Sequence, residues 1–316
     1  MPTPRGDPPL LLTVPLPVSG PLPLSRNLSD PRLFVGTTPD ERGYRPADAV
    51  ALHYGRQRIP RRIVQLGQTW NTSLARYGQQ MRSWWALNPE YEYRYMSDEQ
   101  ASAWLDKPTT RCSAQEKKAY HSLRLGAQRA DLLRMLLCKY EGCVYGDLDM
   151  ELLRPLREFI PSDASAVASV VWPLEILLYE PMHPIVTQVV ALQTQKILEQ
   201  VKLHRKGAHT QCRTPLSCVM RVTGPEVFLN GLHQTTQKQN CSNTIQRIGV
   251  GECAKATDDA FRRTHLCTDQ VEVAGQPLLL CDAFRHHDCR TKKVCPKGHW
   301  QRRARPSSQY FRLDAR

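Results

Sequence analysis

The sequence has no apolar run long enough to cross a membrane, because its best candidate, Leu10 to Val18, is interrupted by Pro15 and Pro17. A membrane-spanning helix needs about 20 apolar residues. The same segment lacks the basic start and continuous apolar core of a signal peptide. No pair among the 11 cysteines has the C-x-x-C spacing of a zinc site. No internal repeat and no RNA- or DNA-binding motif is present, so we expect no nucleic-acid partner despite a net charge of +13.

Proline and basic residues are concentrated at the two ends of the chain. Residues 1–48 hold 11 of the 24 prolines, which predicts a disordered or stem-like leader. Residues 285–316 carry ten Lys or Arg against two Asp, which predicts a basic tail containing Cys and His. Such a tail can be attracted to an anionic membrane surface. Residues 49–284 are then one domain with a sizeable core.

The cysteines indicate the compartment. Eight of the 11 lie between Cys212 and Cys295, which favours disulfides formed in a secretory-pathway lumen. Because the count is odd, at least one thiol is free, and we predict that it is Cys138 or Cys143. Three N-x-S sequons agree with a lumenal location, and they begin at Asn27, Asn71 and Asn240.

Extended and helical patterns alternate through the middle of the chain. They predict strands at residues 59–67 and 91–96 and helices at residues 72–87 and 97–105. Residues 126–149 are predicted to form a further helix and then a strand that ends in aspartates. This order is typical of an α/β domain with a mostly parallel central sheet flanked by helices. Ligands of such sheets bind outside the carboxyl ends of the strands.

The segment from Gly126 to Met150 is the main site candidate. On its helix, Asp131 and Arg134 lie opposite an apolar arc. If the following strand extends through Asp147 and Asp149, both carboxylates point the same way and can bind one divalent ion. Hard cations such as Mg²⁺ or Mn²⁺ favour carboxylate and phosphate oxygens. Taken alone, Asp131 and Arg134 could be a surface ion pair, and Asp147 and Asp149 could be solvated residues of a turn. Their combination in one segment favours a site.

These residues also carry a family resemblance. The pattern Ala130-Asp131-x-x-Arg134, followed by the segment Tyr140 to Asp149, resembles the sugar-binding D-x-D region of glycosyltransferase family 32. That family includes the yeast Golgi initiating α-1,6-mannosyltransferase and the mannosyltransferases of inositol phosphorylceramide. The resemblance implies a GT-A-like nucleotide-diphospho-sugar transferase fold, a Golgi or other lumenal location, and transfer with retention.

The resemblance also implies a ligand set. It implies a Mn²⁺ or Mg²⁺ ion and a nucleotide-sugar donor, with GDP-mannose favoured and a UDP-hexose as the other choice. The acceptor is a glycan or glycolipid hydroxyl. In this picture Asp149 ligates the metal, Asp147 contacts the ribose or sugar and shares the metal shell, and Asp131 with Arg134 grips the hydroxyls of the donor sugar.

Further site residues come from shorter matches. The strand at residues 59–67 is similar to the family's opening strand, which makes Gln65 and Leu66 candidate base contacts, with core and turn positions as the alternative. Tyr145 is a candidate donor contact. A late histidine in relatives makes His287 a candidate metal ligand. Thr223 begins a T-G-P found at the acceptor side of the family's site, although a turn with a proline at a helix start explains it better.

Two other classes of function remain open. A catalytically inactive, lectin-like descendant of the fold is one, because Val64, Cys143 and His299 depart from the family pattern. A phosphatase of the D-x-D-x-T type is less favoured, because Met150-Glu151 follows Asp149 and the motif lies mid-chain.

Overall fold

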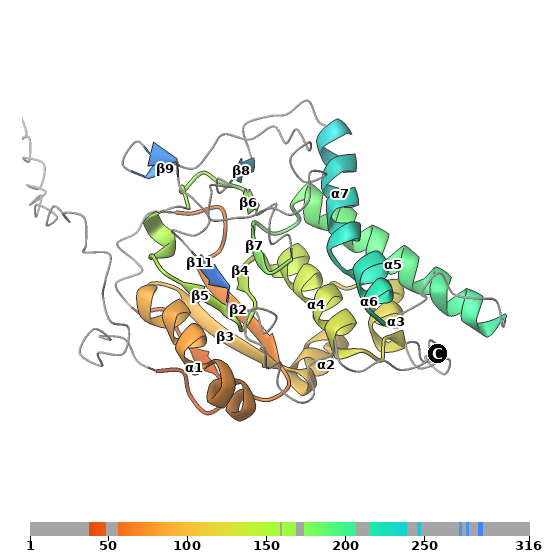
Figure 1. Ribbon diagram of the computed structural model, residues 1–316, viewed down its shortest axis with the longest axis horizontal. Coiled ribbons are helices and arrows are strands. Elements are labelled where there is room, and N and C mark those ends of the chain that lie inside the picture. Colours follow the sequence, from red (N-terminus) through yellow and green to blue (C-terminus); the bar gives the residue numbers. More distant parts are fainter. Residues whose placement is uncertain are drawn as a thin grey trace, which may run out of the picture. The chain divides into compact units, whose positions relative to one another are not determined.

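The computed structural model describes residues 38–48, 56–158, 160–168, 174–206, 215–238, 245–247, 272–273, 276–277 and 284–286. Within this part of the chain a seven-stranded sheet has the order β1-β3-β2-β4-β7-β6-β8 (Figure 1). Its strands, in chain order, are β1 (Tyr44–Arg45), β2 (Arg62–Gly67), β3 (Glu92–Ser97), β4 (Cys143–Gly146), β6 (Ala166–Ala168), β7 (Ile176–Tyr179) and β8 (Ile245–Arg247). Two further pairs join β5 (Met150–Leu152) to β11 (Phe284–His286), and β9 (Glu272–Val273) to β10 (Gln276–Pro277).

The sheet confirms the α/β class but is mixed in direction. Its centre, β3-β2-β4, is parallel, as predicted, and so is the pair β6-β8. By contrast, β7 runs antiparallel to both β4 and β6. The reason is that parallel neighbours need a long crossover, usually a helix. Between β4 and β7 the described chain holds the short strands β5 and β6 and, as its only helical element, the three-residue turn η3 (Leu156–Glu158), so this described part contains no crossover helix.

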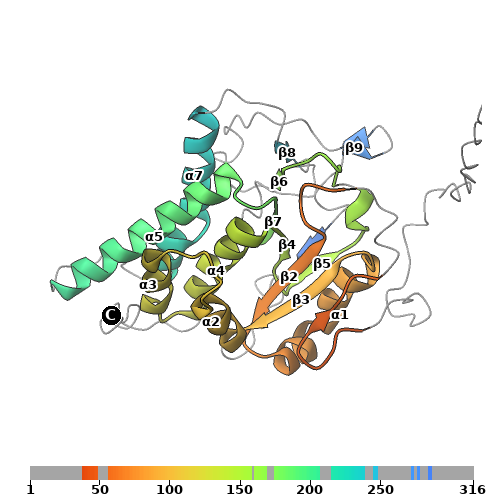
Figure 2. The same cartoon turned by 180° about the vertical axis from the view of Figure 1, so that it is seen from behind.

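Helices lie on both faces of the sheet (Figures 1 and 2). The helix α1 lies against one face, and α4 and α5 lie on the other. The helices, in chain order, are α1 (Trp70–Leu87), α2 (Asp98–Asp106), α3 (Ala114–Ser122), α4 (Gly126–Glu141), α5 (Pro184–Arg205), α6 (Pro215–Cys218), the π-helical turn η4 (Val219–Thr223) and α7 (Pro225–Lys238).

Local capping explains where several helices begin. Ser97 caps α2 and forms a reciprocal capping box with Gln100, and Ser113 caps α3 in the same way with Glu116. The ring nitrogen Nδ1 of His183 accepts a hydrogen bond from the Ile185 amide at 3.3 Å at the start of α5. These contacts are local, so the sequence pattern alone could predict them.

The sheet separates two hydrophobic cores. Alternation along β2 sends Ile63 into the core beneath α1 and Val64 into the core beneath α4 and α5. Trp84 of α1 is fully buried in the first core. Leu136 of α4 is equally buried in the second. Both faces of the D-x-D strand β4 are therefore covered, so only its ends are available to a ligand.

The two predicted end segments both take part in pairing. Within the predicted leader, β1 pairs with β3, and Arg45 donates to the carbonyls of Asn88 and Tyr91 at 2.8 and 2.9 Å. The sheet therefore includes residues that the composition assigns to the leader. Similarly, β11 crosses the predicted boundary after residue 284. None of the helices in the described ranges is both long and apolar enough to span a membrane. Other predicted features lie outside the described residues: His287, His299, Asn27, Asn240 and most of the clustered cysteines.

Candidate functional site

The two aspartates of the D-x-D motif lie in a tight turn between β4 and β5. The amide of Asp147 donates to the Glu175 carbonyl at 2.9 Å, and the amide of Met150 donates back to the Asp147 carbonyl at 3.0 Å. The prediction that strand alternation aligns the two carboxylates is therefore wrong, because Asp149 belongs to the turn rather than to an extended strand. The turn brings the motif to the carboxyl end of β4, where the sheet type predicts a ligand site.

The indole of Trp84 supports this turn from α1. A Cβ atom on Gly146 would collide with the Trp84 ring, so the residue before the motif has room only for glycine. The Trp84 Nε1 donates to the Met150 carbonyl at 2.7 Å. Two anchors thus place the turn relative to α1: close packing on one side and a buried hydrogen bond on the other.

The amide of Gln65 supports the same turn from β2. Its Nε2 donates to the carbonyls of Gly146 and Asp147 at 3.2 and 3.3 Å, and its Oε1 accepts from the Tyr93 hydroxyl at 2.7 Å. The side chain is 0 % exposed. Its polar atoms are therefore engaged by the protein, which contradicts the prediction that this side chain contacts the base. Leu66 packs in the core beneath α4 and α5.

Arg134 joins the helix α4 to the turn. Its Nη1 donates to Asp147 Oδ1 at 2.8 Å and to the Leu174 carbonyl at 2.7 Å, its Nε donates to the Ala130 carbonyl at 3.2 Å, and its Nη2 lies 3.1 Å from Asp131 Oδ1. These contacts use four of its five N–H groups. Burial alone would lower the pKa of Arg134, but the neighbouring Asp147, Tyr145 and Asp131 raise it, so the guanidinium is charged.

Asp147 is held from two sides through one oxygen. Arg134 and the Tyr145 hydroxyl both donate to Oδ1, and neither contact uses Oδ2. Burial raises the pKa of Asp147 and Arg134 lowers it, while the nearby Asp149 adds to the rise. Tyr145 is only 2 % exposed and lies beneath the Arg134 guanidinium, so the structure gives it the role of orienting Asp147.

Asp131 lies in the same network and is almost fully buried. Arg134 contacts its Oδ1, and the Thr223 hydroxyl donates to its Oδ2 at 3.0 Å. Burial raises its pKa to about 6, although Arg134 and Thr223 both act to lower it. The structure therefore brings together four of the predicted residues, namely Asp131, Arg134, Tyr145 and Asp147.

The donor set of the turn fits a hard divalent cation. Asp147 and Asp149 present carboxylate oxygens within one turn, which is the ligand type that Mg²⁺ and Mn²⁺ favour. Among the described residues, no group of three or more His, Cys, Asp or Glu side chains is arranged as a metal site. The third predicted ligand, His287, lies outside them. However, β11 pairs with β5 so that His286 is opposite Met150, the residue after Asp149.

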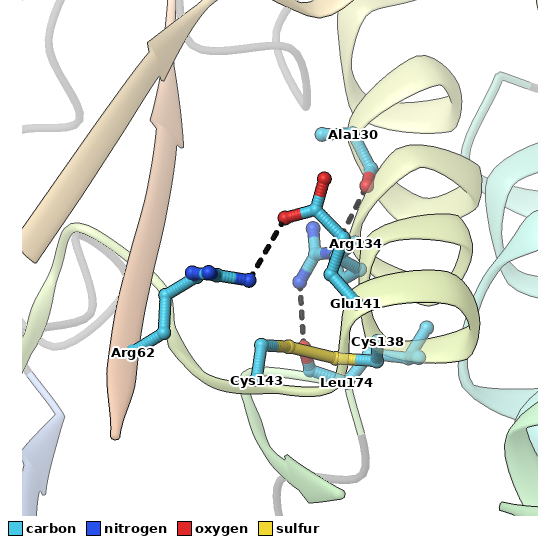
Figure 3. The surroundings of a disulfide bond; sticks show 7 residues. All are labelled: Arg62, Ala130, Arg134, Cys138, Glu141, Cys143 and Leu174. Atoms are coloured by element: carbon cyan, nitrogen blue, oxygen red, sulfur yellow. Dashed lines mark hydrogen bonds and ion pairs between the residues drawn. A yellow bond between two sulfur atoms is a disulfide. The ribbon is translucent and has the colours of Figure 1, made fainter. Parts of the chain in front are cut away.

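A disulfide ties the end of α4 to the start of β4 (Figure 3). Cys138 and Cys143 are bonded to each other, with their Cα atoms 5.0 Å apart. The prediction that one of them is the free thiol is therefore wrong; among the described cysteines the free one is Cys112, which is buried. Gly142 between them adopts a φ of +65°. Cys143, which departs from the family pattern, thus leaves the turn at Gly142 intact. Its disulfide adds a covalent link between α4, which carries Asp131, and β4, which precedes Asp147.

Sequence reasoning missed the supporting residues of the site. Trp84 and Tyr93 support it across long sequence separations, and each belongs to an element that the pattern did predict. The sequence marks Thr223 as the start of a T-G-P turn but does not predict its contact with Asp131. The available signal was weak: Gly146 directly before the motif indicates a close approach by another group, but not which group.

Three comparisons bear on the site. Residues 75–166 match the family model described as "Glycosyltransferase sugar-binding region containing DXD motif". A solved structure titled "PaToxG Glycosyltransferase" is similar, with 15% identity, a TM-score of 0.40, and coverage of 59% of this chain and 72% of that chain. No curated protein matches the sequence. The family match runs from within α1 to the first residue of β6 and includes the Asp131–Arg134–Asp147 network, so the network lies in the part of the chain that resembles a D-x-D sugar-binding region.

Proposed function

We propose, from the D-x-D sugar-binding region at residues 75–166, that this protein is a metal-dependent glycosyltransferase. It transfers a hexose from a nucleotide sugar to a glycan or glycolipid hydroxyl. Within this class we propose membership of glycosyltransferase family 32, GDP-mannose as the donor, and retention of configuration. The observation that carries the proposal is the buried ion-pair network in which Arg134 joins Asp131 to Asp147 at the carboxyl end of β4.

The turn residues supply the diphosphate end of the site. Asp147 and Asp149 would hold the divalent cation, which when bound supplies electrostatic stabilisation of the departing nucleoside diphosphate. Arg134 and Tyr145 fix the orientation of Asp147 through Oδ1, so the carboxylate needs little reorganisation on binding. Because Gln65 and Trp84 hold the turn backbone, both carboxylates have a rigid support.

Asp131 supplies the sugar end of the site. A carboxylate has about four lone-pair positions, and the described contacts of Asp131 use one at each oxygen. The remaining positions can accept hydrogen bonds from two sugar hydroxyls. Arg134 keeps one N–H group for the donor, so its main role is to hold the two aspartates in place.

Two further parts of the proposal concern the C-terminal segment and the compartment. We propose that His287 completes the metal ligands, since the β5–β11 pairing ends one residue before it. We also propose a Golgi or other secretory-pathway lumen. The Cys138–Cys143 disulfide supports an oxidising compartment, because such bonds are rare in reducing ones.

A donor-hydrolysis screen tests the proposal. GDP-mannose and the UDP-hexoses are incubated with wild type with and without Mn²⁺, beside Asp149→Ala and the matched control Asp163→Ala, whose side chain is exposed and remote in the chain from the motif. We expect metal-dependent turnover by wild type and Asp163→Ala, and at least a hundredfold loss in Asp149→Ala. Folded wild type that binds glycan but turns over no donor would refute the proposal and favour the lectin-like alternative.

A further inference from the structure

Buried hydrogen bonds connect α5, through Thr223, to Asp131. The Gln193 Nε2 of α5 donates to the Thr223 carbonyl at 2.5 Å, and the Thr223 hydroxyl donates to Asp131 Oδ2 at 3.0 Å. Thr223 and Gln193 are both 0 % exposed. These two residues therefore connect α5 and η4 to a carboxylate that the proposed function places against the donor sugar.

The Thr223 hydroxyl has a second acceptor within reach, which allows a comparison. Threonines in helices commonly donate to the carbonyl four residues earlier, and here the Val219 carbonyl lies 3.4 Å away. The contact with Asp131 is shorter, at 3.0 Å, and its acceptor carries charge. A hydroxyl has one hydrogen, and bonds to charged acceptors are the stronger ones. The hydroxyl therefore donates its hydrogen to Asp131 rather than to the Val219 carbonyl of its own helical turn.

The backbone around Thr223 has an unusual form that sets this contact. Residues Val219–Thr223 form a π-helical turn, a rare geometry that is frequent at functional sites. The Gly224 amide closes the turn by donating to the Val219 carbonyl at 2.7 Å, and a Cβ on Gly224 would lie 2.6 Å from that oxygen. The wide turn and the following glycine thus fix the position of the Thr223 hydroxyl.

We propose that Thr223 is a positioning residue for the donor sugar, which holds the Asp131 carboxylate in the orientation that reads the sugar hydroxyls. Gln193 in turn holds the backbone of Thr223. With Arg134 on Oδ1 and Thr223 on Oδ2, rotation of the carboxylate is restricted from both sides. This inference rests on the proposed function, and it assigns donor-sugar selectivity to a contact between two residues that are 92 positions apart in the sequence.

The test measures donor KM, kcat and sugar selectivity in matched variants. Thr223→Val removes the hydroxyl and keeps the shape, and Thr223→Ser keeps the hydroxyl. Thr223→Ala also removes the hydroxyl, and it replaces Thr223→Val in the comparison if valine disturbs the fold. The control is Thr235→Val, since Thr235 is also buried but donates to its own helix carbonyl at Gly231, at 2.8 Å. Thermal unfolding establishes that each variant is folded.

We expect Thr223→Val and Thr223→Ala to raise donor KM about tenfold or more with a smaller change in kcat, as for loss of a binding contact. They should also reduce the preference for the best donor over its epimers. Thr223→Ser should behave like wild type, and so should Thr235→Val. Equal kinetics and selectivity in Thr223→Val and Thr235→Val would overturn this inference alone. Absence of donor turnover by folded wild type would overturn the proposed function, and this inference with it.

Discussion

Replacing Asp131 by asparagine should change how the stability of the protein depends on pH. Burial raises the pKa of Asp131 from 3.8 to about 6 in the folded protein. Between these two values the folded state binds the proton more tightly than the unfolded chain does. The contribution of Asp131 to the free energy of unfolding is therefore fully present below about pH 4 and is lost as pH rises through about 6.

The size of this effect follows from the shift. Two pKa units correspond to about 3 kcal/mol over the whole titration, at 1.36 kcal/mol per unit. About 1 kcal/mol of that falls between pH 5 and pH 7. Asp131→Asn does not titrate, so its free energy of unfolding relative to wild type should rise by this amount over the same interval. The subtraction cancels the titrating groups that are remote from Asp131, and Arg134 stays charged throughout this pH range because its acidic neighbours raise its pKa.

Urea unfolding at pH 5, 6 and 7 measures the difference, and Asp163→Asn is the control because its side chain is exposed. In the same pH series, kcat/KM of wild type should decline below about pH 6, where Asp131 becomes protonated. Asp131→Asn should have little activity at any of these pH values. A stability difference that stays constant from pH 5 to pH 7 would refute the assignment of a raised pKa to Asp131.

Three other substitutions test the support of the turn. Gln65→Met should lower the free energy of unfolding by about 3 kcal/mol in urea melts, since it leaves the Tyr93 hydroxyl and two carbonyls without their partner. Gly146→Ala should cost about 2 kcal/mol by overpacking and lower donor turnover, because it displaces Trp84. Replacing Cys138 and Cys143 together by alanine should cost about 2 kcal/mol, the loop-closure value for so short a ring, with non-reducing peptide mapping to verify the bond in wild type.

Each of these expectations has a contrary result. Unchanged stability in Gln65→Met would mean that its amide is not a support of the turn. Full donor turnover by Gly146→Ala would show that the position of Trp84 does not matter to the motif. Two free thiols at positions 138 and 143 in the oxidised protein would contradict the disulfide.

The sequence predicts those parts of the fold whose causes are local. The capping box of Ser97 and Gln100 and the helical periodicity of α4 depend on residues three or four positions apart, so the pattern is sufficient. The pairing of Asp131 with Arg134 is equally local, at i and i+3. These parts of the candidate site follow from spacing.

The remaining parts depend on which elements meet in space. Thr223 reaches Asp131 only because η4 packs against α4, and the sequence of either segment does not specify the other. Gln65 shows the same limit: alternation predicts its strand, but the turn that it supports belongs to a different strand. The direction of β7 also depends on what the described part of the chain between β4 and β7 lacks, namely a crossover helix.

The pairing of β5 with β11 also determines when a newly synthesised chain can complete the strand pair beside the D-x-D turn. Met150 and His286 are more than a hundred residues apart, so a chain growing on the ribosome makes the D-x-D turn long before it makes the strand that pairs beside it. At cellular rates of synthesis the delay is on the order of 10 s. During that interval the parallel strands β2, β3 and β4 are all available to pair, while one edge of β5 has no partner from β11. Chains released before Phe284 would therefore keep the motif and the residues that orient it, yet remain without this last strand.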